Sequence, residues 1–562
     1  MKNAGKLSAL QSEPVIRNLQ LAVGVVAIVL IFWKLQFATG SICCGDFDGY
    51  YHIKWSRILW ESLKHHHLTP AFPWLPLTTL NPKDYVDHHL LFHILEIPFA
   101  RLSDPRLGAK LASILFGSLA LISCYWMLLH YRIRYGLLWL MALLSCSAPF
   151  LFRMNMAKAP PLAIIYLIFG IHLLFKRHYW LLLPLALIFT WTYDMFVLLI
   201  LAAVIWMGVI GWTERRFEWR PLMWVALGTV GGLVINPYFP HNLQLLFEHV
   251  KIKLTPSDFN TKVGSEWYPY DSWEFLRNSV VACIAMLAGY IAFDLGDRKR
   301  ASYPLFFLIF STVLMIMTAR WKRIAEYWPP FAIMFAAFSI QPWIEETRTS
   351  LTKLPSDVLE ELQPFFDRSS VATPDSEQSS KNFIKIIVLS TLTVCLGVAV
   401  FFNVWSTVKE IATSEPPDHY EAGASWLRVN VPPGELIFNT DWDDFPRLFY
   451  YDDTHNYVSG LDPSYLFDKN PDLSQLYDRI TLGQQDDPGP LIKDRFGARY
   501  VFSDNEHHDF FDKARSSGWF DIVYEDTQCT IMRIRDQKTT DDEEQDSVPD
   551  MPTGPIPTQN KN

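Results

Sequence analysis

Two carboxylates near the start of the chain, Asp46 and Asp48, are separated by one residue and followed by a glycine and two tyrosines. A pair of this kind can hold a divalent cation such as Mg²⁺ or Mn²⁺, because these hard ions bind carboxylate oxygens. Alternatively, one acid can act as a general base while the other tunes it. A structural role is equally open, since Asp48 precedes the amphipathic stretch 50–63 and can cap a helix there.

A second group of titratable residues contains Asp87, His89 and His93, with the two histidines one helical turn apart. Imidazole and carboxylate ligands at this spacing can bind zinc. The simpler interpretation, which we favour, is a short amphipathic helix at the membrane surface. Its histidines are then expected to face water or lipid headgroups.

Basic residues gather in two short polar turns between apolar segments, with Arg153 and Lys158 in one turn and Arg320, Lys322 and Arg323 in the other. Guanidinium groups match the oxygens of a phosphate or diphosphate in charge and geometry. These turns are therefore candidates for binding a lipid phosphate. The alternative is that the side chains extend to the membrane surface or pair with Glu326.

The composition indicates a chain made of two unlike parts. Of its 562 residues, 50% are hydrophobic and only 19% are charged, against roughly 25% charged in ordinary soluble proteins. The mean hydropathy is nevertheless only +0.10, which is too low for a chain embedded in a membrane throughout. A net charge of −9 argues against a nucleic-acid partner, which would require a basic face.

About eleven apolar segments approach the ~17–25 residues that are needed to cross a bilayer. They run over residues 18–38, 107–130, 136–152, 159–175, 179–193, 195–212, 221–238, 278–296, 301–318, 324–340 and 384–406. Lys and Arg in alternate short loops place the N-terminus in the cytoplasm. The C-terminus then lies outside the cell membrane, which would be the inner membrane in a Gram-negative cell.

The predicted fold is a polytopic α-helical membrane protein with a C-terminal soluble α/β domain. Its parts are a membrane domain (1–408) with two long outer loops (40–106 and 239–277) and a cytoplasmic linker (341–382), the soluble domain (409–536) and a disordered acidic tail (537–562). All candidate acids and bases fall on the outer face in this topology. That clustering favours a reaction at the outer leaflet over transport, which would place polar groups near the midplane.

Four motifs carry a resemblance to a known family. They are the run from Asp46 to Tyr51, the triplet Trp191-Thr192-Tyr193, Glu266 at the end of a Ser/Thr-x-x-Glu-like motif, and Asp441-Trp442-Asp443-Asp444-Phe445. On these residues the chain resembles GT-C glycosyltransferases. It is most similar to the catalytic subunits of oligosaccharyltransferases, which act in protein glycosylation, and is related to protein O-mannosyltransferases.

The chain also departs from the family pattern at three places. Gly49 stands where the family has proline, and Val263 stands at the Ser/Thr place of the motif that ends in Glu266. The turn from Arg153 to Lys158 contains no acid, although the family completes its metal site there. The acidic part of the metal site that the resemblance implies is therefore incomplete in this chain.

The resemblance implies a membrane glycosyltransferase of the hexosyltransferase type. It would transfer a sugar or oligosaccharide from a polyprenyl-phosphate or polyprenyl-diphosphate donor to a lipid, glycan or protein acceptor at the extracytoplasmic face. The predicted roles are Asp48 and Asp46 for catalysis and for any Mg²⁺ or Mn²⁺, then Arg320, Arg323, Arg153 and Lys158 for the donor phosphate, and Glu266, Trp442, Asp443 and Asp444 for the acceptor or the mobile loop.

Two other functions remain open at the level of sequence. One is a lipid or solute transporter or flippase with an outer binding domain. The absence of an inverted repeat and the small number of charges deep within the segments weigh against it. The other is an inactive GT-C-like scaffold.

Overall fold

The structure is a computed structural model of the chain, and it describes residues 13–43, 47–254, 265–296, 298, 300–350 and 374–538. Asp46, Val263, the tail beyond residue 538 and most of the predicted linker 341–382 lie outside the described residues. The chain divides into two compact units. The first comprises Met1–Phe72 and Pro82–His419, and the second comprises Pro73–Asn81 and Tyr420–Asn562.

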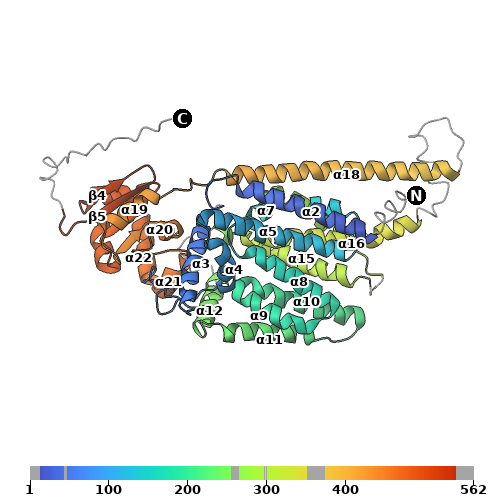
Figure 1. The fold of residues 1–562 in the computed structure, drawn as a ribbon, viewed down its shortest axis with the longest axis horizontal. Coiled ribbons are helices and arrows are strands. Elements are labelled where there is room, and N and C mark those ends of the chain that lie inside the picture. The colour runs from blue at the N-terminus through green and yellow to red at the C-terminus, as the bar shows by residue number, and fades with distance from the viewer. Residues whose placement is uncertain are drawn as a thin grey trace. The chain divides into compact units, whose positions relative to one another are not determined.

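The described part of the first unit is helical (Figure 1). Its α-helices are α2 (Glu13–Gln36), α3 (Asp48–Lys64), α4 (Leu90–Ala100), α5 (Pro105–His130), α6 (Gly136–Ser145), α7 (Ala148–Met154), α8 (Pro160–Lys176), α9 (Leu182–Thr192), α10 (Val197–Glu214), α11 (Arg220–Ile235), α12 (His241–Leu254), α13 (Ser272–Asn278), α14 (Val280–Ala292), α15 (Ser302–Arg320), α16 (Trp328–Ser350) and α18 (Pro374–Ile411). Short 3₁₀ turns lie between them as η1 (Tyr179–Leu181), η2 (Asp194–Phe196), η4 (Ser265–Trp267) and η5 (Lys322–Glu326).

Several of these helices have the length and apolar character of membrane spans. Within the described residues five qualify, namely α2, α5, α10 together with η2, α15 and α18, and there are seven if the bent pairs α6–α7 and α13–α14 each count as one span. Each of the predicted apolar segments overlaps at least one helix, and 136–152 overlaps two, α6 and α7. The number of about eleven crossings stays a prediction.

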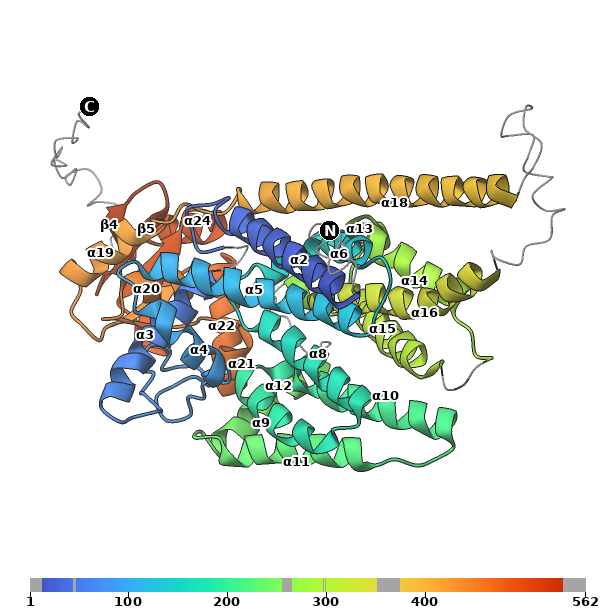
Figure 2. The ribbon, with the colours of Figure 1, turned by 45° about the vertical axis from the view of Figure 1, so that its right-hand side comes forward.

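The outermost helices keep their apolar side chains exposed. Helix α18 runs beside α2 and α6, as Figure 2 shows, and its side chains Val398, Phe401 and Trp405 are exposed. Most of the apolar side chains of α5 are instead buried in the bundle. Apolar side chains on an outward face are favourable against lipid and unfavourable against water. The pattern therefore suits a membrane protein.

The third predicted segment is broken, whereas the sequence suggested one continuous helix over 136–152. Helices α6 and α7 meet at an angle of 87°. The Ser147 hydroxyl caps α7 by accepting a hydrogen bond from the Phe150 amide, and Pro149 follows in the first turn. Proline has no amide hydrogen to continue the helix from α6. The break turns α7 toward η5, against which it packs.

The outer loop predicted over 40–106 contains two helices, α3 and α4, which pack against each other and against α5 (Figure 2). Helix α3 is amphipathic and buries Tyr50, Trp55 and Leu59. Each fully buried side chain of this size contributes roughly 1.5–3 kcal/mol. This burial fixes the first turn of α3, which begins at Asp48.

The second unit combines a five-stranded sheet with short helices. The strands β1 (Leu436–Asn439), β2 (Asn456–Tyr457), β3 (Tyr500–Asp504), β4 (Phe520–Glu525) and β5 (Cys529–Ile534) have the order β2-β1-β3-β5-β4. The first three are parallel, whereas β5 is antiparallel to β3 and to β4. The helices are α19 (Glu421–Asn430), α20 (Phe445–Tyr451), α21 (Ser464–Lys469), α22 (Pro471–Thr481), α23 (Pro488–Leu491), η7 (Ile492–Phe496) and α24 (His508–Ser517).

A piece of the first outer loop belongs to this second unit. Within residues 73–81, the Trp74 carbonyl accepts a hydrogen bond from the Tyr457 amide, and the Trp74 indole donates to the Asp453 carbonyl, both at 2.8 Å. The Thr79 amide donates to the Tyr465 carbonyl at 3.0 Å. The unit is thus built from two separate stretches of sequence.

Candidate active site

Asp48 forms an ion pair with Lys158 at the start of α3. The Lys158 Nζ lies 2.7 Å from Oδ2 of Asp48, and the two side chains are 14% and 23% exposed. Asp48 is the first residue of α3, whose N-cap is Phe47, so the predicted capping role of Asp48 is wrong. The carboxylate is held by a basic residue of the turn that follows α7. Asp46 lies outside the described residues.

Gly49, which follows Asp48, packs closely against Ala157, which precedes Lys158. A Cβ atom added at Gly49 would lie 2.9 Å from the Ala157 Cβ and 2.6 Å from a methyl carbon of Ile42. A larger residue at this position would therefore require Ile42 or Ala157 to shift. The turn that contains Ala157 is also held by α2, because the side-chain amide of Gln36 donates a hydrogen bond to the Asn155 carbonyl.

A second cluster contains two guanidinium groups and two carboxylates. Arg153 Nε donates to Glu326 at 2.6 Å, and its Nη2 donates to Glu266 at 2.7 Å. Arg323 pairs with the same Glu266 carboxylate and also donates to the Tyr193 hydroxyl at 2.6 Å. The predicted alternative that a basic residue pairs with Glu326 is therefore correct for Arg153. Two predicted phosphate-binding residues converge on one carboxylate.

The charges of this cluster keep Glu266 ionised. Burial raises the pKa of a carboxyl group, but the nearby Arg323 and Arg153 charges outweigh burial and hold the pKa of Glu266 below its usual range. The Lys158 charge contributes in the same direction. The Asp48–Lys158 pair and the arginine cluster therefore lie within one electrostatic environment.

A buried hydrogen-bonded chain lies behind the start of α3. Asp87 accepts from His93 Nδ1 at 2.8 Å and from the Trp55 indole at 2.9 Å. His93 Nε2 then lies 2.8 Å from Nδ1 of His52. Which of the two imidazoles donates in this contact depends on their tautomers. The chain fixes the orientation of α3 one turn beyond Asp48.

These histidines do not face water or headgroups, so the favoured interpretation of the sequence was wrong. His93 is buried, and the His89 ring stacks on Tyr193 with its centroid 5.4 Å away. Burial lowers the pKa of His52 and His89, which keeps both neutral at pH 7. Tyr193 also contacts Arg323, so the histidine chain and the arginine cluster adjoin.

The described residues include Asp48 of the predicted metal site but not Asp46. No group of three or more His, Cys, Asp or Glu side chains with metal-binding geometry occurs among them, which covers the zinc alternative too. At Asp48 the ammonium of Lys158 already stands against the carboxylate oxygen. A cation in that position would meet a like charge.

Other predicted site residues lie elsewhere. Arg320 is exposed, with its guanidinium over the Trp321 ring, and does not join the cluster. In the second unit Trp442 and Asp443 are partly exposed, whereas Asp444 is buried. Burial, with Asp441 and Asp504 nearby, raises the pKa of Asp444. Asp444 is therefore suited to a structural role within its own unit.

Sequence reasoning missed two participants, namely His52 and Tyr193 as a hydrogen-bond partner. His52 had a usable signal, since it lies four residues after Asp48 and shares one face of a helix with it. Tyr193 lay within a motif already noted. Its contact with Arg323 joins residues 130 positions apart, which no local pattern indicates.

The arrangement can be compared with known proteins. No family model and no curated protein matches the sequence. Solved structures do match the fold. The apo oligosaccharyltransferase of Archaeoglobus fulgidus is 11% identical with a TM-score of 0.57, over 88% of this chain and 71% of that chain. ArnT from Cupriavidus metallidurans, bound to undecaprenyl phosphate, is 14% identical with a TM-score of 0.53, over 91% of this chain and 97% of that chain.

A third similar structure is the arabinofuranosyltransferase AftD from Mycobacteria, which is 12% identical with a TM-score of 0.50, over 92% of this chain and 40% of that chain. All three are GT-C glycosyltransferases. The fold of this chain is therefore GT-C-like, as the sequence predicted. Identities this low establish the fold and leave the activity to be argued from the site.

Proposed function

We propose that this protein is a membrane glycosyltransferase that takes a sugar from a polyprenyl-phosphate or polyprenyl-diphosphate donor and acts at the extracytoplasmic face. The observation that carries the proposal is the convergence of Arg153 and Arg323 on one carboxylate, beside the Asp48–Lys158 pair, in a GT-C-like fold. Two guanidinium groups directed at one anion form a site for a phosphate.

In the present structure Glu266 is the anion at that site. Its two oxygens take the positions that two oxygens of a donor phosphate would take between the guanidinium groups. Binding of the donor would displace this carboxylate. The fixed positive charges would then stabilise the phosphate as it leaves, which is where electrostatic stabilisation contributes most to a transfer.

The reaction follows from this placement. An acceptor hydroxyl or amide gives its proton to Asp48, and its oxygen or nitrogen forms a bond to the anomeric carbon. The bond from that carbon to the phosphate oxygen breaks, and its electron pair stays on the oxygen. Arg153 and Arg323 hold the departing polyprenyl phosphate or diphosphate. His52, Asp87 and His93 keep the first turn of α3 in place.

The neighbours support the donor class and leave the acceptor open. ArnT was solved with undecaprenyl phosphate, and the Archaeoglobus enzyme was solved with an acceptor peptide that contains an NVT sequon. We extend the proposal to acceptor selection by the second unit, with Trp442 and Asp443 exposed to a lipid, glycan or peptide. Asp46 would support Asp48, and Arg320 would add positive charge at the outer surface.

The test is transfer by the purified protein in lipid nanodiscs, supplied with polyprenyl-phosphate and polyprenyl-diphosphate sugars that carry a radiolabel. We expect transfer or slow donor hydrolysis by the wild type and loss of both in Asp48→Asn. Asp418→Asn, which changes an exposed carboxylate of the same unit, is the matched control and should retain activity. Solute flux without chemistry would indicate a transporter, and neither activity would indicate a scaffold.

A further inference from the structure

The ammonium of Lys158 pairs with the Asp48 carboxylate. It lies 2.7 Å from the Asp48 carboxylate, and its charge also acts on Glu266. The first acid begins α3, and the second belongs to η4 in a different outer segment. A charge-assisted hydrogen bond of this kind neutralises the carboxylate and fixes its orientation. Here a residue of the chain supplies that positive charge.

The backbone around Lys158 holds the ammonium in this place. The Lys158 amide donates to the Met156 carbonyl at 2.8 Å, which makes a tight turn between α7 and α8. Asn155 at the end of α7 is buried, and its side-chain amide lies 3.1 Å from the Cys43 sulfur. Gly49 admits the turn against α3. A lysine on a fixed turn, only 14% exposed, cannot move freely into solvent.

Among the described residues, the carboxylates Asp48 and Glu266 are already paired with positively charged side chains. Arg153 and Arg323 already neutralise Glu266, and Lys158 neutralises Asp48. A divalent cation would have to approach three positive side chains and would find few carboxylate ligands among the described residues. Mg²⁺ is bound through one or two carboxylates with water or substrate phosphate, and here Lys158 already lies against the Asp48 carboxylate.

We propose that Lys158 takes the place of a metal ion in this site, so that the transfer is independent of divalent cations. This inference rests on the proposed function. Lys158 acts as a positioning residue: its ammonium holds the Asp48 carboxylate toward the acceptor and adds a fixed positive charge beside the departing phosphate. The covalently attached ammonium of Lys158 thereby takes the place of an exchangeable metal ion.

The first experiment measures Mn²⁺ binding to the full chain in nanodiscs by electron paramagnetic resonance, with no substrate present. We expect no Mn²⁺ bound at the site in the wild type. Lys158→Glu, which places a third carboxylate beside Asp48 and Glu266, should bind about one Mn²⁺. Stoichiometric Mn²⁺ binding by the wild type that Asp48→Asn abolishes would overturn the proposal.

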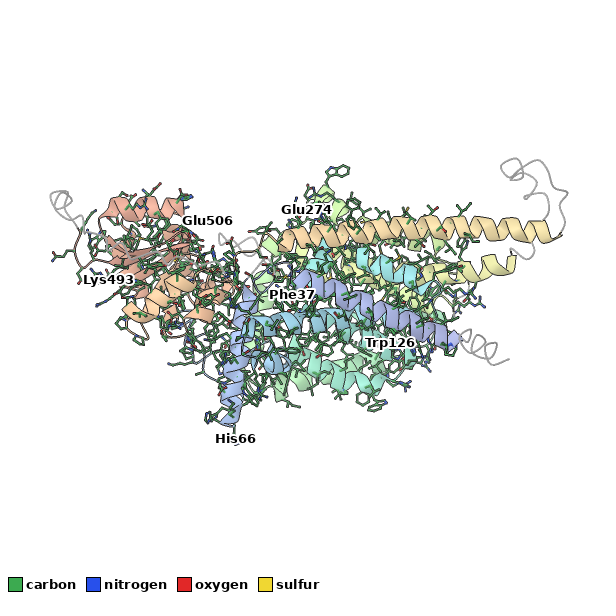
Figure 3. The ribbon with its side chains drawn as sticks, turned by 45° about the horizontal axis from the view of Figure 1, so that its top comes forward. Phe37, His66, Trp126, Glu274, Lys493 and Glu506 are labelled. Carbon is green, nitrogen blue, oxygen red and sulfur yellow. The ribbon has the colours of Figure 1, made fainter. Side chains whose placement is uncertain are left out.

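A matched control is available on the same unit. Lys322 pairs with Glu274 at 3.0 Å and lies outside the Asp48 site; Glu274 is labelled on α13 in Figure 3. Lys322→Glu therefore creates two neighbouring carboxylates without touching Asp48. It should bind no Mn²⁺. Binding that equals that of Lys158→Glu would show that any paired acid attracts the ion, and would overturn the assignment of the place beside Asp48.

The second experiment measures transfer with and without EDTA. Wild-type activity should be unchanged by EDTA, and Lys158→Ala should lose about 10²-fold or more, the range typical of losing support for a general base. Lys158→Glu should regain at least about tenfold of its lost activity when Mn²⁺ is added, which a purely structural role of Lys158 would not produce. Lys158→Arg, which keeps the charge, should stay insensitive to EDTA.

The two experiments separate the two proposals. If the wild type transfers no lipid-linked sugar, the proposed function fails, while the Mn²⁺ measurements still decide whether Lys158 occupies a cation site. If the wild type is active but EDTA abolishes its activity and Mn²⁺ restores it, the proposed function stands and the role of Lys158 is refuted. Should Lys158→Ala fail to fold, the wild type and Lys158→Arg carry the comparison.

Discussion

Replacement of Arg153 by methionine should destabilise the protein much more than loss of an ordinary ion pair. The partner Glu326 has no exposed side-chain surface, and Arg153 is only 14% exposed. Removal of one member of a buried ion pair leaves an uncompensated charge, which costs about 3–5 kcal/mol. The second bond of Arg153, to the partly exposed Glu266, adds at most about 1 kcal/mol.

The assay is equilibrium unfolding in mixed detergent micelles, followed by tryptophan fluorescence. Lys322→Met is the control, because the Lys322–Glu274 pair is about one third exposed on both sides and should cost less than about 1 kcal/mol. The double variant Arg153→Met with Glu326→Leu should recover most of the loss, since no buried charge remains. A cost for Arg153→Met within about 1 kcal/mol of the control would refute the reasoning from burial.

Three further predictions follow from the same geometry. Glu266→Gln removes the charge that competes with the donor phosphate, so the KM for the polyprenyl-phosphate sugar should fall by about 5–20-fold in steady-state kinetics; an unchanged KM would exclude such competition. Gly49→Ala should displace the first turn of α3, costing about 1–3 kcal/mol in unfolding assays and lowering kcat, and normal values of both would exclude the tight packing. Since burial lowers the pKa of His52 and His89, only the unfolded chain gains protons on them just below pH 6.5. Their contribution to stability therefore falls as pH drops below about 6.5, and the Tm should decline there; a smaller decline in His52→Asn would support the assignment, and an equal decline would oppose it.

The helices and strands could largely be predicted from local sequence. Apolar runs overlap the helices of the first unit, and runs rich in strand-forming residues at 435–438, 498–502, 520–524 and 529–533 overlap β1, β3, β4 and β5 of the second. Both signals are local, since they depend on periodicity and on side-chain type. The two-residue strand β2 and the bend at Ser147 are set by pairing and capping, and neither gives a periodic pattern of its own.

The residue types that make up the candidate site could be picked out from the sequence, but the contacts between them could not. Asp48, Lys158, Arg153, Arg323 and Glu266 were all singled out by type and by their common side of the membrane. Their pairing joins positions between 57 and 113 residues apart, for which the sequence holds no local signal. Lys158 was consequently assigned to the phosphate, whereas its observed partner is a carboxylate.

The histidines show why burial changes the interpretation of a motif. The spacing of His89 and His93 is compatible with a surface helix, the interpretation favoured from sequence, and with a metal site, and the outcome depends on what covers that face. In the structure α3 and α4 cover each other, so the polar side chains between them must satisfy one another. The outcome is a hydrogen-bonded chain that neither interpretation of the sequence contained.

The central claim is that Asp48 serves a sugar transfer from a polyprenyl-linked donor. The most direct measurement is the release of polyprenyl phosphate or diphosphate from a radiolabelled donor by wild-type protein and by Asp48→Asn, each in nanodiscs and each shown to be folded by its unfolding transition. The account predicts release by the wild type and a loss of about 10²-fold or more in the variant. Equal release by both proteins would contradict it.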